Sequence, residues 1–92
     1  MIEKLLIADS TVSVEILSSA TKHGQSRDDI IYALERSIYD ETLETDPNKT
    51  LSIGYDRSAR LIEVIFHVLS DDHIVVFHAM RCRNYYIERM LK

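Results

Sequence analysis

The sequence predicts an α+β domain in which helices cover one face of an antiparallel sheet. The second half of the chain holds runs of β-branched and aromatic residues separated by turn residues, a pattern typical of strands. The first half holds an apolar stripe at helical spacing behind a helix start at Ser26. Because 92 residues is the length of one domain, we expect residues 1–92 to form a single unit. It would contain a sheet of three to four strands, two N-terminal helices and a C-terminal helix.

One short strand and a first helix are expected before Gly24. Residues 2–8 are predicted to form the strand. Ser10 and Thr11 are candidate N-caps of the helix. Its apolar residues follow at helical spacing: Val14, Leu17 and Ala20. Gly24 can adopt the left-handed conformation that ends a helix, so we expect this helix to stop there.

A second helix is predicted directly after this corner. Ser26 followed by Asp29 indicates a variant capping box, and Asp28 adds negative charge to the first turn. The apolar stripe of this helix is Ile30, Ile31, Leu34 and Ile38. From residue 40 the chain is acidic, and it reaches a turn at Asp46-Pro47-Asn48.

Strands and tight connections are expected to alternate in the second half. The predicted strands are residues 51–55, 61–69 and 73–79, with breaks at 56–58 and 70–72. In the strand over 61–69, side chains alternate between two faces. One face would carry Ile62, Val64, Phe66 and Val68, and the other Leu61, Glu63, Ile65, His67 and Leu69. Residues 83–91 are predicted to form the closing helix, with Tyr86, Met90 and Leu91 as its apolar contacts.

Charge and composition narrow the class of protein. The formal net charge is −4, but residues 1–46 carry four basic and ten acidic side chains, whereas residues 47–92 carry seven and five. An acidic front and a basic tail are compatible with a local anion site. Cys82 is the single cysteine, so no intrachain disulfide can form. The chain has neither an apolar run of membrane-spanning length nor a secretory leader pattern, and we expect a cytoplasmic protein with no membrane partner.

Several chemical signatures are absent from the sequence. It contains no GxGxxG or GxxxxGK[ST] loop, no HExxH or paired CxxC, and no GxSxG elbow. The histidines do not have the spacing of a metal site. We therefore expect neither a metal ion nor a cofactor. The absence of these motifs excludes most large enzyme classes.

The remaining polar groups suit metal-independent cleavage of an RNA phosphodiester. His23 and His78 could transfer protons, because imidazole titrates near neutral pH. Glu63 is a candidate base if burial raises its pKa. Each also has a purely structural interpretation. His23 could complement a helix C-terminus, His78 could be a hydrogen-bonded, half-buried histidine, and Glu63 could lie on a solvated sheet face.

Cations and aromatic residues complete the candidate site. Lys22, Arg81 and Arg83 could hold a phosphate or the charge of the transition state. Tyr85 could stack on a base, although core packing is the alternative for at least one of Tyr85 and Tyr86. The arginines could equally begin a solvated helix. The hypothesis requires the Lys22-His23-Gly24 corner and the HAMRCR segment (residues 78–83) to meet in the fold.

Two segments together resemble a known family. ATKHGQSRDDIIYALERSIYDE and LIEVIFHVLSDDHIVVFHAMRCRNYYIERML are similar to the KHG-plus-helix opening and the terminal strands and basic helix of BrnT-type toxins. These are ribonucleases of bacterial type II toxin–antitoxin modules with a RelE-like fold. The resemblance covers about residues 8–91 and is nearest to an actinobacterial branch whose last strand ends in HAM followed by arginines. Where the family reads SAR, this chain has His78-Ala79-Met80, so one arginine is missing.

The resemblance implies a toxin that cleaves RNA without metal, inhibits translation and is blocked by a cognate antitoxin. Lys22 and His23 match the KHG motif, and Arg81 and Arg83 fall where the terminal arginines of the family cluster. The substrate would be RNA, with ribosome-associated mRNA as one candidate. The alternative is a non-catalytic interaction module, an inactive relative that forms a homodimer or docks a partner. The acidic first half and the missing arginine favour that alternative.

Overall fold

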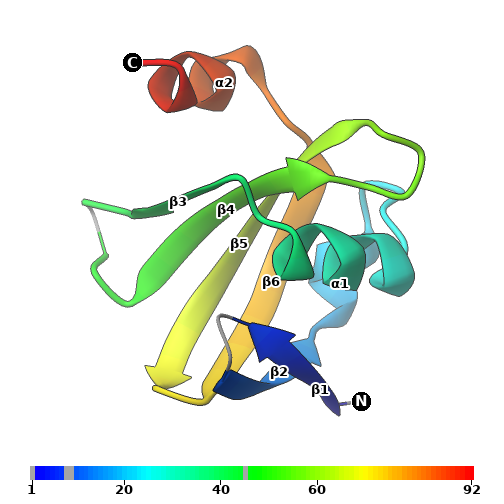
Figure 1. Cartoon of the computed structure of the whole chain (residues 1–92), viewed down its shortest axis with the longest axis vertical. Helices are drawn as coiled ribbons and strands as arrows, with labels where there is room; N and C mark the ends of the chain where they lie inside the picture. The colour runs from blue at the N-terminus through cyan, green and yellow to red at the C-terminus, as the bar shows by residue number, and fades with distance from the viewer. Residues whose placement is uncertain (1, 8–9, 45) are drawn as a thin grey trace.

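The fold is organised around one mixed sheet. The computed structural model of the chain describes residues 2–7, 10–44 and 46–92, and its strands follow the order β1-β2-β6-β5-β4-β3 (Figure 1). The strands are β1 (Ile2–Ile7), β2 (Ser10–Ile16), β3 (Tyr39–Thr42), β4 (Lys49–Tyr55), β5 (Leu61–Ser70) and β6 (His73–Arg81). The helices are the 3-10 turn η1 (Ser18–Thr21), α1 (Arg27–Glu35) and α2 (Asn84–Met90). Neighbouring strands are antiparallel except β2 and β6, which are parallel.

The predicted fold is therefore wrong in its sheet and in its N-terminal half. An antiparallel sheet of three to four strands behind two N-terminal helices, the RelE-like arrangement that the resemblance implied, is replaced by a six-stranded mixed sheet. Two of its strands, β1 and β2, come before the internal helix. The α+β class itself holds.

The segment expected to form the first helix is strand β2. Val12, Val14 and Ile16 are buried, and the residues between them are less so, which is the period of two of a strand with one face on the core. Their β-branched side chains favour extended backbone. Leu17, an anchor of the expected helical stripe, is 38% exposed. Only the single turn η1 remains helical, and Gly24 follows it with φ 90°, the left-handed conformation expected there.

Strand β3 was not predicted. It comprises four residues in which half-buried and exposed side chains alternate, at the edge of the sheet beside β4. Its acidic side chains, Asp40 and Glu41, are unusual in strands, so its composition gave no indication of one. Helix α1 ends at Glu35, which leaves Ile38 outside the helical stripe and 52% exposed.

The other predicted elements are present with shifted ends, but the predicted core contact of Leu91 is wrong. The expected strand over 2–8 is β1; residue 8 lies outside the described residues. Ser26 caps α1, since its hydroxyl accepts a hydrogen bond from the Asp29 amide. Asp46 accepts a hydrogen bond from the Asn48 amide in the predicted turn. Strands β4, β5 and β6 are each longer than expected, and Leu91, expected to contact the core, is 76% exposed beyond α2.

Two hydrophobic clusters cover the two faces of the sheet. On one face α1 packs on Ile62 and Val64 of β5 together with residues of β1, β2 and β6. On the other face α2 packs with Leu61 and Ile65, as the alternation along β5 predicted. The expectation that all helices share one face is thus wrong, because successive side chains of β5 contact different helices.

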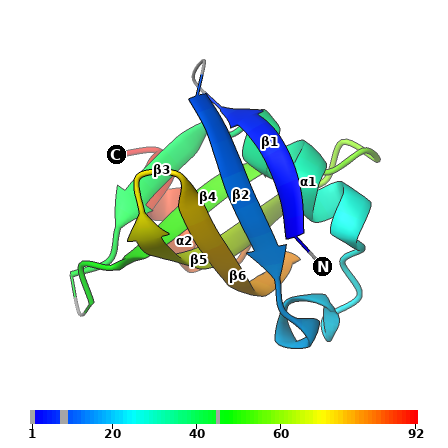
Figure 2. The ribbon, with the colours of Figure 1, turned by 90° about the horizontal axis from the view of Figure 1, so that it is seen from below.

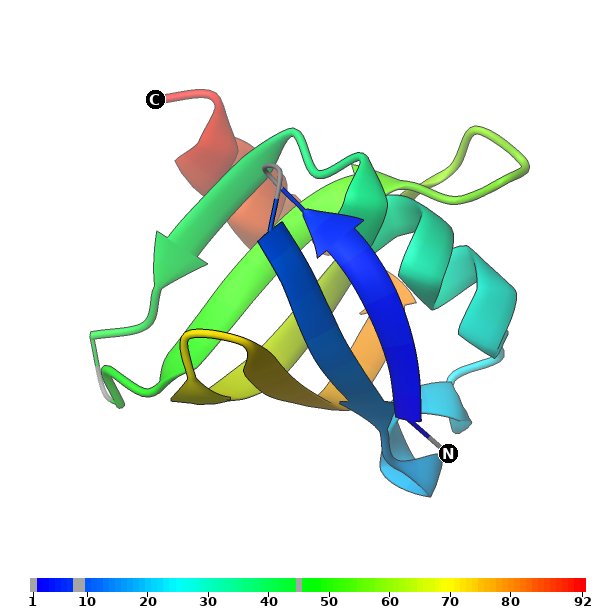
Figure 3. The ribbon, with the colours of Figure 1, turned by 60° about the horizontal axis from the view of Figure 1, so that its bottom comes forward.

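The sheet is strongly twisted around α1. In Figures 2 and 3, β1 and β2 run at a steep angle to β4 and β5. Helix α1 contacts β1, at one edge of the sheet, as well as β4 and β5. No helix of the described residues has the length and apolar character needed to cross a membrane.

The close packing of α1 on β4 depends on Gly54. A Cβ built at this position would lie 2.6 Å from the Ala33 backbone oxygen, a contact that only a backbone shift can relieve. We expect Gly54→Ala to lower the free energy of unfolding by about 1–3 kcal/mol, as overpacking does. Urea unfolding measures this, with Ser58→Ala in the exposed β4–β5 loop as a control that should change little. A Gly54→Ala protein as stable as the wild type would contradict the helix placement.

Candidate active site

A fully buried carboxylate lies at the centre of the candidate site. Glu63 is 0% exposed and projects from β5 toward the α2 side of the sheet. Arg83 binds it through three groups: the backbone N–H (3.0 Å to Oε1), Nε (3.1 Å to Oε1) and Nη2 (2.7 Å to Oε2). His78 Nε2 lies 2.9 Å from Oε2. The sequence left open a solvated sheet face for Glu63, and the structure excludes that alternative.

The hydrogen bonds of Glu63 decide its protonation state. Burial on its own would raise the pKa of the carboxyl, but the hydrogen bonds from Arg83 and His78 outweigh it and hold the pKa below the ordinary 4.5. Glu63 is therefore an anion at neutral pH. A carboxylate with this pKa and these partners is suited to holding His78 and Arg83 in place rather than to removing a proton from a substrate.

His78 is oriented by this carboxylate. Because an ionised carboxylate only accepts hydrogen bonds, the Nε2 of His78 carries the proton between them, which leaves Nδ1 as the nitrogen able to accept a proton. The side chain is 19% exposed, so solvent and ligands can reach part of the ring. A neighbouring carboxylate also compensates the positive charge that an imidazole gains when it takes a proton.

His23 reaches this site through the parallel pairing of β2 with β6. Where β2 ends, the Leu17 amide donates to the Val76 carbonyl, and the Ser19 hydroxyl donates to the Phe77 carbonyl. These bonds keep η1 alongside the C-terminal half of β6. The exposed His23 ring then lies edge-on to His78, with ring centroids 5.7 Å apart. The glycine corner and the end of the last strand, far apart in the sequence, therefore meet.

The predicted cations are divided between the two faces. The Arg83 side chain is 52% exposed although it binds Glu63, so one side of its guanidinium is open to a ligand. Lys22 is exposed, next to His23. Arg81 is in register with Ile62, which packs on the α1 side, so the pairing places Arg81 on the opposite face from Glu63 and His78.

Tyr85 lies on the exposed side of α2. The residue is 63% exposed, and its ring meets that of Tyr86 at a centroid distance of 5.1 Å. The Arg83 guanidinium lies 5.4 Å from the centroid of the Tyr86 ring. Tyr86, half-buried against the α2 side of the sheet, thus connects Tyr85 to the group that binds Glu63.

Sequence reasoning missed a second polar cluster beside α2. Arg89 of α2 binds the carboxylate of Glu41 through two nitrogens, and the Tyr39 hydroxyl donates to the same carboxylate. Strand β3 carries both Tyr39 and Glu41. Since that strand was not predicted, no pattern in the sequence indicated that Glu41 would face Arg89.

Cys82 lies between the two arginines but is not a reactive thiol. Its side chain is buried, and burial, followed by the charge of Glu63, raises the pKa of the thiol to about 11. Among the described residues, no three His, Cys, Asp or Glu side chains are placed to hold a metal ion.

Comparisons with known proteins give no relative. No protein-family model, curated protein or solved structure matches the chain.

The state of Glu63 predicts how stability responds to acid. Because its pKa in the fold lies below 4.5, the unfolded chain takes up a proton first as the pH falls. Its contribution is complete above about pH 4.5 and is lost as the pH falls through the lowered pKa. Asp29 and Glu41, whose pKa values hydrogen bonds from Arg57 and Arg89 also lower, add to the same loss.

We expect Glu63→Gln to be less stable at neutral pH, by about 1–3 kcal/mol, and to lose less on acidification than the wild type. Urea midpoints measured from neutral pH to about pH 3 test this. Glu88→Gln, a change on the exposed face of α2, should run parallel to the wild type. If the urea midpoint of Glu63→Gln fell with pH as steeply as that of the wild type, the Glu63 carboxylate would not be ionised in the folded protein.

Proposed function

We propose that this chain is a ribonuclease that cleaves RNA without metal, acting in the cytoplasm as the toxin of a toxin–antitoxin pair. The observation that carries the proposal is the meeting of His23 and His78 beside the Glu63 carboxylate. Two imidazoles at one accessible point supply a base and an acid, which cleavage of a phosphodiester by the 2′-hydroxyl requires. The toxin role and the antitoxin partner rest on the sequence resemblance alone.

In the proposed reaction His78 acts as the base. Its Nδ1 takes the proton of the ribose 2′-hydroxyl while Glu63 holds Nε2–H and compensates the charge that develops on the ring. The 2′-oxygen forms a bond to phosphorus, and the bond from phosphorus to the 5′-oxygen breaks. His23, in its protonated form, gives its proton to that leaving oxygen. The products are a 2′,3′-cyclic phosphate and a free 5′-hydroxyl.

Positive charge beside the histidines would hold the phosphate. The partly exposed Arg83 guanidinium binds the same carboxylate as His78, and the exposed Lys22 is adjacent to His23 in the chain. Such cations stabilise the charge that builds up on the non-bridging oxygens in the transition state. Arg81, which belongs to the opposite face, has no part in this scheme.

Removal of either histidine should reduce cleavage by about 100-fold or more, because each would supply one proton transfer. The assay is cleavage of a fluorescent single-stranded RNA in the presence of EDTA, with His23→Ala and His78→Ala compared with the wild type. His67→Ala is the matched control, since His67 lies on β5 four residues from Glu63, about 13 Å along the strand. A 2′-deoxy sugar at the cleaved nucleotide should block the reaction. A wild-type protein that leaves RNA intact contradicts the proposal.

A second function, a non-catalytic interaction module, is favoured by one observation. Strand β1 is at an edge of the sheet and exposes large apolar side chains: Ile2 is 55% and Leu6 is 64% exposed. An edge of this kind can pair with a second copy or with another protein.

Two measurements separate the functions. Size-exclusion chromatography with light scattering reports the oligomeric state, and a titration of RNA across salt concentrations reports phosphate binding. A stable dimer without affinity for RNA supports the interaction module. A protein whose RNA affinity falls steeply with salt supports the nuclease.

A further inference from the structure

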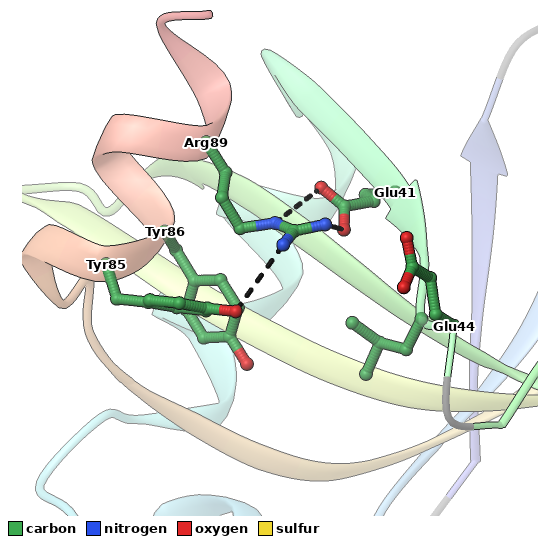
Figure 4. A pocket seen from close by; sticks show the side chains of 6 residues that line it. Glu41, Glu44, Tyr85, Tyr86 and Arg89 are labelled. Atoms are coloured by element: carbon green, nitrogen blue, oxygen red, sulfur yellow. Dashed lines mark hydrogen bonds and ion pairs between the residues drawn. The ribbon is translucent and has the colours of Figure 1, made fainter.

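An open pocket lies between α2 and the chain just after β3. Its volume is about 200 Å³ (Figure 4). Its lining residues are Glu41, Leu43, Glu44, Tyr85, Tyr86 and Arg89. The volume suits a single ring system or side chain rather than a whole drug-sized ligand, which typically occupies about 300–1,000 Å³.

Aromatic rings form one wall of the pocket, and Leu43 is the aliphatic residue of its lining. Figure 4 shows the tyrosine rings of α2 on one side and the Glu44 side chain on the other. Arg89 donates from Nη1 to the Tyr85 hydroxyl at 3.4 Å while its other nitrogens bind Glu41. Arg89 therefore links Glu41 of β3 to Tyr85 of α2.

The charge of the pocket argues against a phosphate. Glu41 neutralises Arg89, and among the residues that the structure describes Glu44 forms no ion pair. Two carboxylates and one guanidinium leave the pocket with a formal charge of −1. Burial, followed by the charge of Glu63, raises the pKa of Tyr86, so its hydroxyl stays neutral and can donate. The pocket thus offers a carboxylate acceptor, a hydroxyl donor and aromatic surface.

The pocket adjoins the proposed catalytic site through Tyr86. The Tyr86 ring lines the pocket and lies 5.4 Å from the Arg83 guanidinium, which binds Glu63. A nucleotide whose phosphate meets Arg83 and the histidines therefore has a neighbouring base within reach of the tyrosines. Aromatic stacking and hydrogen bonds to the Watson–Crick edge are the usual means by which proteins recognise single-stranded RNA.

We propose that this pocket binds a guanine base beside the scissile bond, an inference that rests on the proposed nuclease function. The Watson–Crick edge of guanine presents two adjacent donors, N1–H and the 2-amino group, which match the two oxygens of the Glu44 carboxylate. Its O6 oxygen accepts from a hydroxyl, as the Tyr86 group provides. The Tyr85 ring, which is inclined at 70° to the Tyr86 ring, stacks against the base. Uracil and cytosine lack the paired donors.

Cleavage mapping tests the assignment. On an RNA that contains every dinucleotide step, the wild type should cut beside guanine, and replacement of that guanine by inosine, which lacks the 2-amino group, should slow the cut about tenfold. Glu44→Gln should lose the same preference. Glu88→Gln also removes one negative charge, but from a residue of α2 outside the pocket. This variant should retain the guanine preference. Cleavage without a guanine preference, or a preference that Glu44→Gln leaves intact, overturns the inference while the nuclease function stands.

A binding experiment does not depend on cleavage. In NMR titrations of the His78→Ala protein, guanosine should shift the ring signals of Tyr85 and Tyr86, and inosine should bind about tenfold more weakly. Guanosine carries no phosphate, so its binding reports the pocket alone. If lysine amide or arginine amide shifts these signals and guanosine does not, the pocket accepts a side chain of a protein partner and the inference is wrong. If the protein binds guanosine but does not cleave RNA, the guanine pocket is supported and the nuclease function is contradicted.

Discussion

The buried carboxylate of Glu63 is the interaction on which the rest of the site depends. An isolated charge with no exposure would be very unfavourable, and it persists because Arg83 and His78 surround it with donors. These donors come from different parts of the fold. His78 belongs to β6, and Arg83 is the residue that immediately precedes α2. One carboxylate therefore fixes both the orientation of an imidazole and the point at which the last helix begins.

This arrangement links the histidine site to the pocket beside α2. The backbone N–H of Arg83 donates to Glu63, so the start of α2 is tied to the middle of β5. From that start the helix places Tyr85 and Tyr86 at the rim of the pocket, and Arg89 reaches across to Glu41 of β3. Ion pairs at both ends of a seven-residue helix compensate for its shortness, since helices of this length are marginal without tertiary contacts.

The features that the sequence predicted correctly are those that depend on residues close together in the chain. The Ser26 cap, the left-handed Gly24 and the alternation along β5 each follow from residues close in sequence, and each is observed. Strand β2 was mistaken for a helix because Val14, Leu17 and Ala20 also fit a helical period. Its partners, β1 and β6, decide its conformation, and the pairing with β6 joins segments that no local pattern connects.

The same distinction applies to the candidate site. Residue type identified His23, His78, Glu63 and Arg83 as candidates. The pairing of β5 with β6, two strands that were predicted, brings Glu63 to His78 and Arg83. The approach of His23 depends on the parallel pairing of β2 with β6, which was not predicted. Arg81 shows the limit of reading proximity from sequence. It is two residues from Arg83, yet the strand alternation that buries Ala79 on the α1 side also directs Arg81 there. A mechanism that uses Arg83 therefore need not use Arg81. Chemistry at this site would depend on one well-anchored guanidinium and two imidazoles rather than on a dense group of arginines, which fits a protein whose net charge is negative.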